Sequence, residues 1–96
     1  MTSTREKAEK AIVAFAIEKA LLEFGAPALE EVTNMLSEYC HCEISDCFEK
    51  PQYLNKVLKD IFGNSYIIIV KSIKKNLEEF AYEKPIENFL NEISKS

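Results

Sequence analysis

The chain has 96 residues, of which 47% are hydrophobic and 29% are charged, with only 2 Gly and 3 Pro. This composition excludes a disordered or low-complexity chain, and the length fits a single domain over residues 1–96 with one modest core. The formal net charge of -4 disfavours nucleic acid and anionic membranes as partners. No apolar run approaches the roughly 20 residues that cross a bilayer, so we expect a cytoplasmic protein.

The first expected helix covers residues 4–24. Ser3 and Glu6 have the spacing of a capping box, and Gly25 is typical of a helix end. Apolar residues recur at helical spacing in two stripes. One stripe consists of Ala8, Ile12, Phe15 and Leu22, and the other consists of Val13, Ile17, Ala20, Leu21 and Phe24.

A helix that is apolar on two sides needs cover from several neighbouring helices or from a second copy of the chain. We expect both to contribute. The residues predicted to contact a partner are Val13, Ile17, Leu21 and Phe24. The alternative is that the bundle surrounds this helix completely and leaves no partner surface.

Two further helices are marked by their first residues. Pro27 suits the first turn of a helix over residues 27–40, and Pro51 suits the first turn of a helix over residues 51–62 that ends at Gly63. In each helix the apolar residues recur every three or four positions, which predicts one buried face.

The segment from Tyr66 to Val70 is rich in β-branched residues and could form a buried strand. Its apolar spacing continues at a helical period, and Ser65 is a good N-cap, so we predict one helix over residues 65–80. A last helix is expected over residues 85–94, after Pro85. The predicted fold is therefore all-α, a compact bundle of about five helices with an irregular Cys-rich turn at residues 40–50.

The stretch EYCHCEISDC contains all three cysteines and the one histidine of the chain. Because thiolates and imidazole bind zinc, one hypothesis is a metal or redox sensor that uses Cys40, His41, Cys42 and Cys47. Zinc sites usually take ligand pairs from two separate segments, however, and an odd number of cysteines favours reduced thiols. The competing interpretation is that the cysteines are core residues and that Asp46 caps a short turn.

Charge is unevenly distributed along the chain. Residues 26–49 contain six carboxylates and no Lys or Arg, whereas residues 50–75 contain six lysines and one acidic residue. Such faces are typically solvated and complement one another within or between subunits. A weaker alternative is a DNA-binding regulator that uses Lys71, Lys74 and Lys75.

One part of the chain also resembles a known family. The matching positions are Asp46, Cys47, Pro51, Leu54, Leu58, Ile61, Phe62, Gly63, Ile69, Val70, Ser72, Ile73, Leu77, Phe80 and the tail at residues 83–90. These positions resemble the small output domain family of ammonia-oxidising thaumarchaea, the Nitrosopumilus output domain family. The resemblance implies an all-helical archaeal domain that occurs alone or attached to signalling modules. It carries over no catalytic or binding residue, and Cys40, His41 and Cys42 are not part of the pattern.

The sequence contains no Gly-rich phosphate loop and no Ser-His-Asp set, so we expect neither an enzyme nor a cofactor. The preferred interpretation is a helical module that acts by association, either as a homodimer or with another protein of a signalling pathway. The metal or redox sensor and the DNA-binding regulator remain as alternatives.

Overall fold

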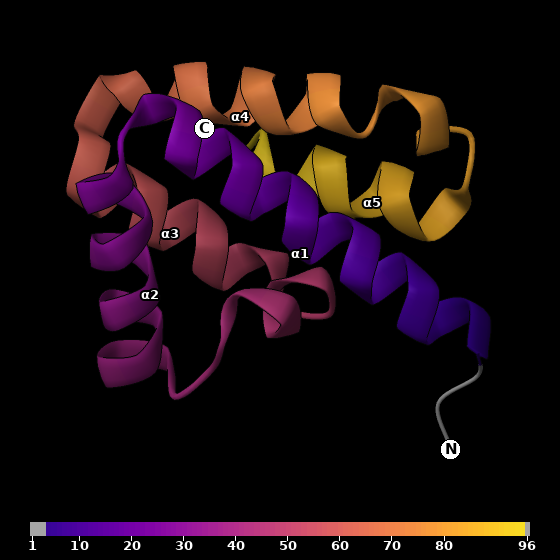
Figure 1. The fold of residues 1–96 in the computed structure, drawn as a ribbon, viewed down its shortest axis with the longest axis horizontal. Coiled ribbons are helices and arrows are strands. Elements are labelled where there is room, and N and C mark those ends of the chain that lie inside the picture. Colours follow the sequence, from indigo (N-terminus) through magenta and orange to yellow (C-terminus); the bar gives the residue numbers. More distant parts are fainter. Residues whose placement is uncertain (1–3, 96) are drawn as a thin grey trace.

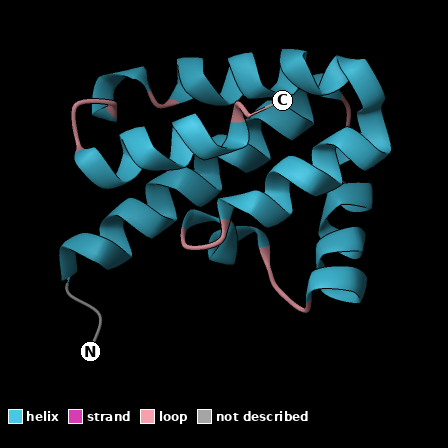
Figure 2. Ribbon diagram, turned by 180° about the vertical axis from the view of Figure 1, so that it is seen from behind, coloured by secondary structure: helices cyan, strands magenta, loops and turns pink. Residues whose placement is uncertain are grey.

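The computed structural model describes residues 4–95, and within this range the chain is helical without a strand (Figures 1 and 2). The α-helices are α1 (Thr4–Phe24), α2 (Ala26–Cys40), α3 (Pro51–Phe62), α4 (Tyr66–Asn76) and α5 (Lys84–Ile93). Three short 3-10 helices connect them, namely η1 (Ile44–Phe48), η2 (Gly63–Ser65) and η3 (Glu78–Phe80). The predicted all-α fold is confirmed, and Tyr66–Val70 is helix.

The longest helix, α1, organises the bundle. It crosses the front of the molecule in Figure 1 and packs against α2, η1 and α4, while α3 packs against α2 and α5. Gly25 separates α1 from α2 with φ 153°, a backbone conformation that disfavours any residue with a Cβ. The predicted capping box of α1 includes Ser3, which lies outside the described residues.

The Cys-rich segment is more regular than its composition predicts. After α2 ends, the backbone N–H of Cys42 donates to the Leu36 carbonyl, and residue 41 takes the left-handed conformation. A capping box then opens η1, in which Glu43 is the N-cap and the Asp46 carboxylate accepts from the Glu43 N–H at 2.9 Å. Asp46 thus caps this turn from its third position.

The helix expected over residues 65–80 ends earlier, at Asn76. Leu77 leaves helical geometry with φ -107° and ψ 5°, and its N–H is shared between the carbonyls of Ile73 and Lys74. Such tightening into a 3-10 turn is common at helix ends. The fully buried Leu77 holds this break against the core, and η3 then turns the chain toward α5. The N-cap position of Ser65 is confirmed, although its side chain makes no capping hydrogen bond.

The buried apolar side chains form one continuous core drawn from every α-helix and from η1. Its largest fully buried members include Ile17, Leu36, Leu58, Ile73 and Phe89. None of the helices in the described part of the chain combines the length and the apolar composition needed to span a bilayer.

Candidate interaction surface

The predicted partner contacts on α1 are largely core residues. Val13, Ile17 and Leu21 are fully buried against the other helices, so a partner cannot reach them in the folded chain. Only Phe24 of the four residues remains accessible, and its ring also packs edge-on against Phe62 at 5.1 Å between centroids. The assignment of this stripe to a partner is therefore corrected, because α2, η1 and α4 cover it within one chain.

The exposed stripe of α1 is the other one. Phe15 is 69% exposed and Leu22 is 53% exposed, values far above those of core residues. Glu23 lies beside Leu22 on one side and beside Ile68 of α4 on the other, and Ile68 is 60% exposed. We call the three residues Phe15, Leu22 and Ile68 the α1–α4 surface. Exposed large apolar side chains near one another on a surface mark sites of association.

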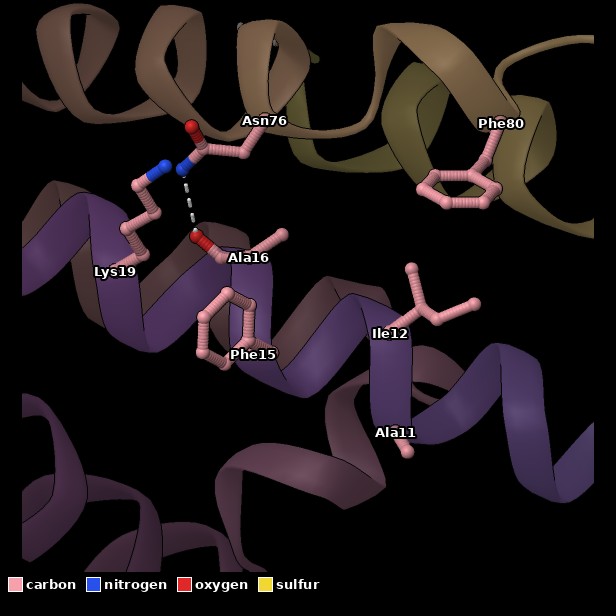
Figure 3. Close-up of a pocket in the computed structure, with 7 residues that line it drawn as sticks. All are labelled: Ala11, Ile12, Phe15, Ala16, Lys19, Asn76 and Phe80. Carbon is pink, nitrogen blue, oxygen red and sulfur yellow. Dashed lines mark hydrogen bonds between the residues drawn. The ribbon is translucent and has the colours of Figure 1, made fainter.

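A groove of about 390 Å³ runs along one edge of this surface, between α1 and the segment from α4 to η3 (Figure 3). In Figure 3, Ile12 and Phe80 point toward one another across the groove. The amide of Asn76 donates to the carbonyl of Ala16 at 3.1 Å, which ties α4 to α1. The lining residues are Ala11, Ile12, Phe15, Ala16, Lys19, Asn76 and Phe80. A groove with one cation, one engaged amide and otherwise apolar walls fits an apolar side chain better than a polar substrate.

Sequence reasoning missed this surface because both stripes of α1 are apolar. One signal could have separated them. The charged residues that follow Lys10 in α1 are Glu18, Lys19 and Glu23, and at 100° per residue all three lie on the side of Phe15 and Leu22. Charged side chains avoid the core, so the stripe beside them is the outer one.

The Cys-rich segment does not assemble a metal centre. Cys42 and Cys47 are buried and their thiols contact one another, whereas His41 is exposed at the end of α2. From residue 4 to residue 95, no three His, Cys, Asp or Glu side chains are grouped so that they could hold a metal ion. The arrangement of Cys40, His41, Cys42 and Cys47 therefore does not support the hypothesis of a metal site.

The same burial affects the chemistry of the thiols. Burial is the main reason that the pKa of Cys47 is raised to about 12, and the neighbouring Cys42 adds to it. Burial likewise raises the pKa of Cys42. Since the thiolate is the reactive form, these environments make Cys47 and Cys42 poor nucleophiles at neutral pH. They are core residues, as the competing interpretation predicts.

The lysines proposed for DNA contacts lie on the exposed side of α4. Lys71, Lys74 and Lys75 are all solvent-exposed, and none of them forms an ion pair with another described residue. Exposed lysines opposite a buried stripe are the usual arrangement on a surface helix. The structure adds no feature that favours nucleic acid.

The acidic segment around η1 is matched by α1 instead of by the lysines of α4. Lys10 Nζ lies 3.0 Å from Glu49 Oε1 and 3.4 Å from Asp46 Oδ1. The Glu43 N–H and Lys10 together lower the pKa of Asp46. This contact fixes η1 against the first half of α1.

Glu9 is a buried carboxyl in the first half of α1. It is 4% exposed, and its Oε2 has no hydrogen-bond partner. Burial is the largest cause that raises the pKa of Glu9, followed by the hydrogen bond with Glu83 and the charge of Glu83. Arg5, whose Nη2 donates to Glu83 Oε1 at 3.0 Å, opposes this shift. The contact between the carboxyl groups of Glu9 and Glu83 joins α1 to the turn before α5.

Comparison with protein-family models, with curated proteins and with solved structures finds no match to this chain. The resemblance to the thaumarchaeal output domain family rests on the residues quoted above and stays a prediction.

Proposed function

We propose that this chain is a non-enzymatic helical module that functions by protein–protein association through the α1–α4 surface. The observation that carries the proposal is the exposure of Phe15 and Leu22 on the outer stripe of α1, together with Ile68 on α4. Large apolar side chains with this exposure gain free energy when a partner removes them from water. The resemblance to signalling output domains supports the same assignment and suggests an archaeal regulatory context.

The groove beside this surface supports binding rather than catalysis. Its polar groups are Lys19 and Asn76, and the Asn76 amide already donates to a backbone carbonyl. A nucleophile with an adjacent general base is what covalent catalysis requires, and the lining residues supply neither a hydroxyl, a thiol nor an imidazole. The apolar walls would instead hold an aromatic or aliphatic anchor of a partner protein.

Site-specific photo-crosslinking tests this proposal. A photoreactive phenylalanine analogue at position 15 is expected to give a covalent protein adduct in an extract of the source cells, whereas the same analogue at position 39 is not. Tyr39 is a matched control, because it is 71% exposed but lies on α2, outside the α1–α4 surface. An excess of unlabelled wild-type chain should compete with the adduct, and an excess of the Phe15→Ser chain should not.

The opposite results would contradict the proposal. They are equal adducts from positions 15 and 39, or no adduct from either, or competition by the Phe15→Ser chain that matches that of the wild type.

A further inference from the structure

The outer stripe of α1 changes in size along the helix. Its first half presents the exposed small residues Ala8 and Ala11, and its second half presents Phe15 and Leu22. Two such helices that pack in an antiparallel manner can bring Phe15 of one copy onto Ala8 and Ala11 of the other. Small residues opposite large ones let helices approach closely and fill the space between them.

The charges beside this stripe have a matching arrangement. Lys7 and Glu18 are exposed and lie eleven positions apart, which is three helical turns, so they share one edge of the outer stripe. Neither side chain forms an ion pair with another residue of the described chain. In an antiparallel pair related by a two-fold axis, residues on the same edge of the two helices face one another, so Lys7 of each copy can face Glu18 of the other.

We propose that the partner of the α1–α4 surface is a second copy of this chain, bound through antiparallel packing of α1 on α1. This inference rests on the proposed function and names the partner. The register that pairs Lys7 with Glu18 places the two-fold axis midway between positions 12 and 13. Phe15 of one copy then lies opposite position 10 of the other copy, flanked by Ala8 and Ala11.

This register also uses the groove. Ala11 and Ile12 line the end of the groove that Phe80 closes, so the ring of Phe15 from the second copy covers the exposed edge of these side chains (Figure 3). Because the contact is isologous, the same insertion occurs twice. Two aromatic anchors flanked by two ion pairs are a typical composition for an interface core and rim.

Sedimentation velocity of the full chain, from about 1 µM to about 1 mM, tests the inference over the range of weak and transient interfaces. The wild type is expected to pass from monomer to dimer within this range. Phe15→Ser should weaken dimerisation by about 30-fold or more, the loss that removal of an aromatic anchor causes. Tyr39→Ser, on an equally exposed aromatic residue away from the surface, should leave dimerisation unchanged.

A charge exchange tests the register. Lys7→Glu and Glu18→Lys each place like charges opposite one another and should weaken the dimer by about tenfold at low salt, and the double variant should restore it. Lys71→Glu is the control for net charge, since Lys71 is exposed on α4 and has no ion pair. Lys7, Glu18 and Phe15 are exposed, so the variants should keep the far-ultraviolet circular dichroism of the wild type.

A wild-type chain that stays monomeric over the whole range would overturn the inference, and so would a dimer in which the double variant shows no recovery. Either result leaves the proposed function to be judged by the crosslinking experiment, because an adduct at position 15 with a different protein would support association without self-association.

Discussion

At the scale of single residues, the buried carboxyl of Glu9 is an unfavourable feature of the fold. Its Oε2 is buried without a hydrogen-bond partner, and Glu83 and Glu6 add negative charge nearby while Arg5 reduces it. An unpaired buried charge is costly, which is why burial and the neighbouring Glu83 raise the pKa of Glu9. A proton on this carboxyl would provide a hydrogen-bond donor toward Glu83.

Glu9→Gln should therefore raise the free energy of unfolding at pH 7, by about 0.5–1 kcal/mol, because the amide keeps a donor toward Glu83 and carries no charge. The folded pKa of Glu9 is raised above its ordinary value of 4.5, so the stability that its protonation contributes is present below pH 4.5 and is lost as the pH rises through the folded pKa. The advantage of the variant should thus disappear on acidification. Urea denaturation at several pH values measures this, with the exposed Glu30→Gln as control. A variant that is less stable than the wild type at pH 7 would contradict it.

Among the elements, η1 depends most on polar contacts. It is only five residues long, and it is held by its capping box and by the pairing of Lys10 with Asp46 and Glu49. Cys47 and Ile44 anchor its apolar side in the core. The segment that looked irregular in sequence is therefore a packed element that closes the core beside α1.

Asp46→Ala should lower the free energy of unfolding by about 1 kcal/mol at pH 7, because it removes the acceptor of the Glu43 N–H as well as one partner of Lys10. The folded pKa of Asp46 lies below its ordinary value of 3.8, so its contribution is present above pH 3.8 and is lost as the pH falls through the folded pKa. Glu49→Ala is the matched control. It removes an exposed ion pair without a capping bond and should cost only a few tenths of a kcal/mol. Equal losses in the two variants would show that the capping bond does not matter.

At the scale of the whole molecule, α1 serves two surfaces at once. Its inner stripe, with Val13, Ile17 and Leu21, is the centre of the core, and its outer stripe, with Phe15 and Leu22, faces solvent. A chain of this size has few helices with which to cover a long apolar one, and the remaining apolar surface is what the proposed partner would cover.

The two stripes should respond differently to substitution. Ile17→Ala should lower the free energy of unfolding by about 2–5 kcal/mol, as a cavity in the core does, and Ile17→Asp should unfold the domain rather than only dissociate a dimer. Phe15→Ser should change the stability of the monomer by no more than about 0.5 kcal/mol. Thermal denaturation at low micromolar protein measures both. A Phe15→Ser chain that unfolds as readily as Ile17→Ala would show that Phe15 belongs to the core.

The sequence by itself determined the helical class, the single core and most helix boundaries, because these follow from local causes. Proline at helix starts, glycine at Gly25 and Gly63, and apolar spacing at a period near 3.6 act over a few residues and survive in any packing. The predicted end of α4 was wrong by four residues. The helix was expected to reach Phe80 but ends at Asn76, because the buried side chain of Leu77 holds the break.

The charges beside Phe15 and Leu22 point to the outer stripe of α1, but only the tertiary structure decided how completely the inner stripe is covered. Periodicity shows that two faces are apolar, but the covering of one of them depends on where α2, η1 and α4 lie, and those positions come from contacts between distant segments. The same holds for the cysteines, whose burial and poor reactivity arise from the packing of η1 on α1 and not from their spacing. Local patterns set the elements, and long-range packing set the surface through which this chain is proposed to act.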